Sequence, residues 1–218
     1  MKKILLPVFS FVLLTNTIFA QIDVVGGMGI NLVYSPSLND YINFNWTTEN
    51  IADFSTAVEF YGEVDYSITE KFQLGLEYVY VLWSYNTSLF IGGNYNLDYI
   101  HLKPSLLAYY VISGEGYKFK FGGGIGVRGA KLTESIGTTI EGSQEFSVLG
   151  VGILGRVQGH TKLGGNFYAN IGGTIRYDAP GDPTSDESDN PLYNPITKEA
   201  VNLSCFSVSL DIGISYFF

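Results

Sequence analysis

The residues that could do chemistry in this chain are two histidines, one cysteine and a scattered set of charged side chains. Neither His101 nor His160 has a serine at the spacing of a nucleophile and its base, and a lone histidine more often belongs to a hydrogen-bond network. Cys205 is the only cysteine, so an intramolecular disulfide is impossible. We therefore expect no catalytic site and no cofactor.

A cluster of acidic residues lies in a segment rich in proline and serine near the C-terminus. Its carboxylates offer the oxygen ligands that calcium prefers, but their spacing does not match an EF-hand loop. We expect a solvated acidic loop and no metal site. The cluster comprises Asp178, Asp182, Asp186, Glu187 and Asp189.

Most other charged residues alternate with apolar ones. From Val58 to Ile68 the even positions carry no charge, whereas three of the odd positions are acidic. A period of two is the pattern of a β-strand with one apolar and one polar face. Eight runs follow this rule, at residues 27–34, 58–68, 72–82, 100–110, 117–128, 149–158, 166–177 and 206–218.

The lengths of the links between these runs also alternate. Long links at 35–56, 86–97, 132–145 and 179–200 are separated by short ones at 69–71, 113–116 and 159–162. Small bacterial barrels alternate long outer loops with short periplasmic turns. The chain is therefore predicted to be all-β, an eight-stranded antiparallel transmembrane up-and-down β-barrel with both termini in the periplasm.

The alternative is a soluble sandwich or lipocalin-like barrel, in which the apolar face would point inward. Aromatic residues at strand ends favour the membrane interpretation, because they form girdles at the two interfaces. The periplasmic girdle is expected at Tyr66, Phe72, Tyr110, Tyr117, Tyr216 and Phe218. The outer girdle is expected at Tyr34, Phe60, Tyr80, Tyr177 and Phe206.

The N-terminus has the layout of a secretory signal peptide. Lys2 and Lys3 precede an apolar run, and Ala20 ends a segment suited to cleavage. We expect residues 1–20 to be removed and residues 21–218 to form the barrel. With 12 basic against 21 acidic residues, the chain has no basic surplus for nucleic acid.

The C-terminal sequence from Asp211 to Phe218 resembles the last-strand signal of small bacterial outer-membrane barrels of the OmpX, opacity and porin-like group. Gly213, Tyr216 and Phe218 carry the resemblance. It implies residence among outer-membrane lipids and recognition by the barrel-assembly machinery. Members include structural, adhesive, small-pore and lipid-modifying proteins, so the resemblance does not define a function. The His-x-Ser-Asn pattern of barrel lipid A deacylases is absent.

The polar faces place charged residues of both signs inside the barrel. Because an eight-stranded barrel is just wide enough for side chains to fill it, we expect an ion-pair network that plugs the lumen. Asp65 should lie near Lys118 and Lys120, and Glu59 near Arg128 or Arg176. A narrow charged pore is the alternative. The predicted network comprises Glu59, Glu63, Asp65, Glu77, His101, Lys103, Lys118, Lys120, Arg128, Arg156, Arg176 and Asp211.

The first long link carries four aromatic residues, Tyr41, Phe44, Trp46 and Phe54. They could contact a surface partner or cap the barrel mouth, and the sequence does not choose between the two. We expect a monomeric barrel with a structural or surface-interaction role and no identifiable partner.

Overall fold

Eight long strands close into a ring in the computed structural model, which describes residues 22–47, 51–89, 93–137 and 142–218. The predicted signal peptide lies outside the described residues. The ring strands are β1 (Ile22–Tyr34), β2 (Phe54–Thr69), β3 (Phe72–Ser88), β4 (Asn94–Gly114), β5 (Tyr117–Gly137), β6 (Gly142–Gly164), β7 (Phe167–Ala179) and β11 (Cys205–Phe217).

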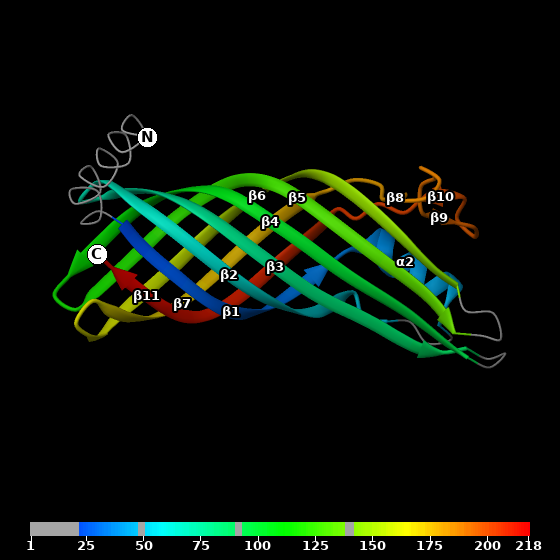
Figure 1. Cartoon of the computed structure of the whole chain (residues 1–218), viewed down its shortest axis with the longest axis horizontal. Helices are drawn as coiled ribbons and strands as arrows, with labels where there is room; N and C mark the ends of the chain where they lie inside the picture. Colours follow the sequence, from blue (N-terminus) through cyan, green and yellow to red (C-terminus); the bar gives the residue numbers. More distant parts are fainter. Residues whose placement is uncertain (1–21, 48–50, 90–92, 138–141) are drawn as a thin grey trace, which may run out of the picture.

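Each ring strand pairs antiparallel with its neighbours in sequence, β11 pairs with both β7 and β1, and β5 pairs with β6. The predicted eight-stranded antiparallel barrel is confirmed. β1 begins and β11 ends at one end of the barrel. Helix α2 (Pro36–Asn45) and the short strands β8 (Thr184–Ser185), β9 (Tyr193–Asn194) and β10 (Glu199–Ala200) lie at the other (Figure 1). We call the end where β1 begins and β11 ends the closed-turn end, and the end that holds α2 the outer end.

The apolar face of the strands points outward. Leu106, Ile171 and Leu210 are 64%, 68% and 73% exposed, and outward residues of the other ring strands are exposed in the same way. So large an apolar surface is incompatible with water and suits the hydrocarbon of a bilayer. The soluble alternative, which requires the apolar face inside, is therefore excluded.

Aromatic residues cluster near both ends of the strands. At the outer end, Phe206 is the direct cross-strand neighbour of both Tyr34 and Tyr177. At the closed-turn end, the rings of Phe72 and Tyr110 are 5.6 Å apart and the ring of Tyr216 lies 5.0 Å from that of Phe167. Tyr34, Tyr177 and Phe206 thus lie in the expected outer girdle, and Phe72, Tyr110 and Tyr216 in the expected periplasmic girdle, whereas Phe60 and Tyr80 pair with each other nearer the middle of β2 and β3.

Two of the expected long links are mostly strand. β3 continues to Ser88 before β4 starts at Asn94, and β5 continues to Gly137 before β6 starts at Gly142. The expected links at 86–97 and 132–145 were therefore too long. Beyond the bilayer an outward residue no longer has to be apolar, so the alternation fades while the hydrogen-bonded ladder continues.

The expected turn at 159–162 was also misplaced. β6 runs on to Gly164, and the turn that joins it to β7 contains Gly165, which has a positive φ of 55°. His160 therefore lies in a strand and points into the barrel, where it is 1% exposed. The sequence did not predict a strand around His160, because the alternation of apolar and polar residues ends before the hydrogen-bonded pairing of β6 with β7 does.

Helix α2 covers the outer end of the barrel. Leu38, Tyr41 and Ile42 share one face of the helix and are buried, as the spacing of three and four residues requires. They pack on an apolar cluster of inward residues from the strands and from the chain between β8 and β11, with further members Tyr95, Leu97, Tyr99, Ala130, Leu132, Phe146, Leu192, Val201 and Leu203. No helix in the described part of the chain is long and apolar enough to cross a membrane.

Candidate functional site: the barrel lumen

Charged side chains from every ring strand meet inside the barrel below this apolar cluster. Acidic residues come from β1, β2, β3, β7 and β11, and basic residues come from β4, β5, β6 and β7. All the residues of the predicted network point inward, and all are buried except Lys118, whose side chain is 17% exposed.

Near the closed-turn end, two lysines share two aspartates. Asp23 accepts from Lys118 at 2.8 Å and lies 3.0 Å from Lys120, which also pairs with Asp65. Asp65 therefore meets Lys120 as expected, whereas Lys118 pairs with Asp23 instead. The Lys118 ammonium also lies 3.8 Å from the centre of the Phe217 ring, a favourable cation–π distance.

Arg156 is the central cation of the lumen. It lies 3.1 Å from Glu63 and 3.5 Å from Asp211, and it also pairs with Glu77. Its guanidinium lies 4.8 Å from the centre of the Tyr61 ring. One arginine thus contacts carboxylates from three strands, and these contacts link opposite walls of the barrel.

Arg176 forms the next layer toward the outer end. It contacts Glu77 at 3.1 Å and Glu59 at 3.5 Å, and donates to Ser209 Oγ at 3.1 Å. The expected proximity of Glu59 to Arg176 is present. Asn31 also donates to Glu59 at 2.8 Å.

Asp178 holds the outermost ion pairs. Lys103 lies 2.8 Å from one of its oxygens, and Arg128 donates to the other. Arg128 fits beside the wall because the adjacent position on β5 is a glycine: a Cβ on Gly126 would lie 2.7 Å from Arg128 Nη1 and 2.1 Å from the Pro104 carbonyl.

Above these layers the outer mouth is closed by apolar packing and one carboxylate. The Tyr41 and Tyr95 hydroxyls donate to the same oxygen of Glu134, at 2.6 and 2.7 Å. Burial, together with the negative charge of Glu134, raises the pKa of the Tyr41 hydroxyl well above its usual value of 10.0. Tyr41 therefore stays a neutral donor that holds α2 in the mouth.

The four aromatic residues of the first link have different roles. Tyr41 is buried in the mouth, and Trp46 stacks on Tyr95 with ring centres 4.2 Å apart. Phe44 is 50% exposed on the opposite face of α2. Phe54 lies at the start of β2, and its side chain is outside the described part of the structure. The structure thus assigns Tyr41 and Trp46 to the cap and leaves Phe44 available for contact.

Two acidic residues of the network were not expected. Asp23 is the second residue of β1 and lies four residues before the expected inward Gly27, whereas Asp178 lies near the end of β7, two residues after the expected inward Arg176. Continuing the period of two past Gly27 to residue 25 and then 23, and past Arg176 to residue 178, would have found them. Asp178 had been assigned to the acidic loop.

The remaining residues of the acidic loop do not converge. Asp182 accepts from Asn202 at 2.7 Å and Asp186 accepts from Ser147 at 2.5 Å. In the described residues, the one group of His, Cys, Asp and Glu side chains close enough to share a metal ion is His101, Asp178 and Cys205. It lies inside the barrel rather than in the loop.

A second polar cluster surrounds His160 near the closed-turn end. Its Nδ1 lies 2.8 Å from Ser215 Oγ and 3.2 Å from Asn170 Nδ2, and Tyr61 donates to Asn170 at 2.8 Å. Both His160 and Ser215 are buried, and in the described part of the chain Ser215 and Asn170 hold the imidazole ring, so His160 belongs to a hydrogen-bond network.

The C-terminal residues are packed into the wall. A Cβ at Gly213 would lie 2.4 Å from the Gly26 carbonyl, so only glycine allows β11 and β1 to approach here. The Tyr216 ring lies 4.6 Å from that of Phe218, on the outer surface. Recognition by an assembly machinery stays a prediction.

The closed ring, the apolar exterior and the filled polar bore define the fold of a small bacterial outer-membrane β-barrel. The crystal structure of Ail, the attachment invasion locus protein of Yersinia pestis, has this fold: the match covers 91% of this chain and 98% of that one, with 11% identity and a TM-score of 0.51.

Two further solved structures resemble the chain less closely. Neisserial surface protein A matches with 13% identity over 90% of this chain and 97% of its own, at a TM-score of 0.46. The outer-membrane protease OmpT of Escherichia coli matches with 9% identity over 91% and 97%, at 0.48. No protein-family model and no curated protein matches the sequence.

Proposed function

We propose that this protein is a closed outer-membrane barrel that does not conduct ions or solutes, with a structural or surface-interaction role exerted at its outer end. The observation that carries the proposal is the filling of the lumen. Side chains of opposite sign bridge the walls in successive layers, and α2 seals the mouth above them.

Burial within this network supports a closed lumen. Arg128, Arg156 and Arg176 are each 2% exposed or less, as are Glu59, Glu63 and Glu77. A water-filled pore would leave such groups hydrated, since ionised side chains are desolvated only at a cost that pairing must offset. The runner-up, a narrow pore for small solutes, has less support.

The outer end offers the surface for any partner. Phe44 of α2, Tyr193 of β9 and Ile196 are 50%, 49% and 58% exposed there, and Asn45 lies 3.3 Å from Asn194, which joins the helix to the loop. The start of β1 and the end of β11 lie at the opposite end of the barrel. We assign that end to the periplasm because short turns face that side in small barrels.

Single-channel recording in a planar bilayer tests the closed lumen. We expect the mature chain, residues 21–218, to insert without discrete openings, while heat-dependent gel mobility confirms that the barrel has formed. Regular openings of the folded wild-type barrel would contradict the proposal and identify the ionic lumen as a selectivity filter.

Two variants separate the contributions of cap and network. Deleting residues 38–53 should lower stability by removing the cap yet leave the barrel silent, because the ion pairs below persist. Replacing Glu63 and Asp65 by alanine should lower the unfolding temperature or open a conductance. If neither property changes in the double variant, the network does not plug the lumen.

A further inference from the structure

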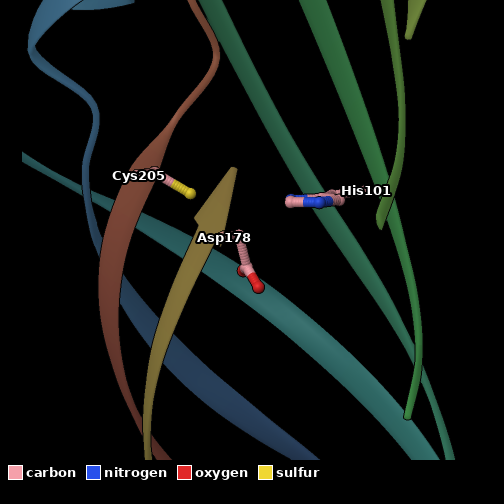
Figure 2. A group of neighbouring side chains, drawn as sticks. All are labelled: His101, Asp178 and Cys205. Atoms are coloured by element: carbon pink, nitrogen blue, oxygen red, sulfur yellow. The ribbon is translucent and has the colours of Figure 1, made fainter. Parts of the chain in front are cut away.

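Three potential metal ligands meet at the top of the lumen, beneath α2. His101 comes from β4, Asp178 from β7 and Cys205 from the start of β11; the side chains of His101 and Cys205 point toward each other, and the carboxyl group of Asp178 lies between and below them in the view of Figure 2. One donor atom of each residue lies within 4.8 Å of the others, and all three residues are buried. Two donors on one ion lie about 3.5 to 4.4 Å apart, given metal–nitrogen and metal–sulfur bonds of about 2.0 and 2.3 Å.

His101 has an unused nitrogen at this place. Its Nδ1 lies 3.0 Å from the Tyr99 hydroxyl, whereas its Nε2 is buried and has no hydrogen-bond partner among the described residues. The side chain is 1% exposed, so water does not hydrate it freely. A metal-binding histidine usually donates its other ring N–H to an oxygen acceptor, and the Tyr99 hydroxyl oxygen lies in place for that bond.

Cys205 is the matching soft ligand. It is 4% exposed and is the only cysteine of the chain, so it has no disulfide partner. A cavity of about 30 Å³ is lined by His101, Lys103 and Cys205 of the barrel wall and by Leu38 and Asn39 of α2. A space of that size accepts a single water or ion.

The charges around the cavity select the ion. Both oxygens of Asp178 are already engaged by Lys103 and Arg128. A divalent ion that replaced the thiol proton would add a positive charge beside these two cations, whereas a monovalent ion would add none. Thiolate and imidazole together suit soft ions such as Cu(I).

We propose that His101 and Cys205 bind one monovalent soft metal ion of the Cu(I) class, with Asp178 beside them as a third, weaker oxygen ligand. On binding, the S–H bond of Cys205 breaks, an S–metal bond forms and the proton is released to solvent. Neither the metal nor the sulfur changes oxidation state. Asp178 keeps its pairing with Lys103 and Arg128, so it binds the ion more weakly than the two principal ligands.

Silver(I) provides a probe of the same charge and softness that resists oxidation. The mature barrel is refolded in chloride-free detergent with Ag(I) or with Zn(II), so that entry past α2 does not limit binding, and the metal retained after desalting is counted per folded chain. We expect about one Ag(I) and no stoichiometric Zn(II) in the wild type. Bound metal should also protect Cys205 from alkylation by a maleimide after denaturation without chelator.

Cys205→Ser should abolish retention of Ag(I). His101→Asn, which keeps a polar side chain in place, should weaken Ag(I) binding by about ten- to a hundredfold. His160→Ala is the matched control, because it removes the other buried histidine and should leave binding unchanged. Heat-dependent mobility checks that each variant is folded, and His101→Gln replaces His101→Asn if that variant does not fold.

Three outcomes would overturn the proposal. Failure of the folded wild type to retain Ag(I) would show that the cluster is no metal site. Equal affinity in the wild type and the His101 variant would reduce the site to a bare thiol. Stoichiometric Zn(II) in preference to Ag(I) would show that the site is selective for a divalent ion.

Discussion

At the scale of single residues, the lumen depends on a few cations that each serve several carboxylates. Arg156 is the clearest case, since it contacts Glu63, Glu77 and Asp211 and stacks near Tyr61. Removing such a cation leaves several carboxylates buried without a partner, which costs far more than losing a surface pair.

Arg156→Met should therefore lower the free energy of unfolding by about 3 to 5 kcal/mol, the range measured when one partner of a buried pair is removed. Urea unfolding of the barrel in lipid vesicles measures the change. Lys131→Met is the matched control: its pair with Glu145 is exposed on both sides, so its unfolding should match that of the wild type. Equal effects of the two variants would contradict the network.

At the scale of elements, α2 is the part of the fold that the strands do not require. The barrel closes through the ladders of its eight strands, and the helix is attached by side-chain packing, by the Tyr41–Glu134 hydrogen bond and by hydrogen bonds to the loops such as that from Asn45 to Asn194. Its attachment should therefore respond to conditions that leave the barrel intact.

Alkaline pH should loosen α2. Burial and Glu134 raise the pKa of docked Tyr41 above 10.0, the value expected for the released helix. Docking is thus fully stabilised below pH 10.0 and weakens as the pH rises above that value, because the released tyrosine loses its proton first. Fluorescence of Trp46, in a background in which Trp83 is replaced by phenylalanine, should shift to the red above about pH 10.

Tyr41→Phe is the control for this effect. It keeps the ring but removes one ionisable group. Docking of α2 should therefore be weaker at neutral pH, and its stability should fall less as the pH is raised further. A Trp46 emission that shifts equally with pH in both proteins would assign the effect to another group.

At the scale of the whole molecule, the polar and apolar faces of the strands are exchanged relative to a soluble barrel. Charged side chains pair within the bore, and large apolar side chains are exposed on the outer face of the strands. This arrangement is stable only where the exterior meets hydrocarbon, so stability should depend on the lipid face in a depth-dependent way.

Ile171→Arg tests this orientation. Ile171 lies between the aromatic residues Phe167 and Tyr177 on the exterior of β7 and is 68% exposed. The substitution should destabilise the barrel in vesicles by about 2 to 4 kcal/mol. Ile196→Arg, 58% exposed in the outer loop, should have little effect, and a similar cost at both sites would contradict the placement of the bilayer.

Much of the fold and of the lumen was predictable because a strand has a period of two. Alternation assigned each of the twelve network residues to the inner face, and charge on that face together with the narrow bore implied ion pairs. The same rule missed Asp23, because the apolar Val25 interrupts the polar face of the first run, and Asp178, because Ala179, Pro180 and Gly181 follow it directly. It also placed His160 in a turn, because the apolar half of the alternation stops before the strand does.

The sequence by itself determined the strands, their order around the wall and which face of each carries charge, because these depend on local alternation and link length. Only the tertiary structure decided which charges meet, how far the strands extend beyond the bilayer, that α2 fills the mouth, and that His101, Asp178 and Cys205 converge. These features depend on the register and tilt of strands distant in sequence, which bring residues 101 and 205 together across the bore, and no local pattern encodes that distance.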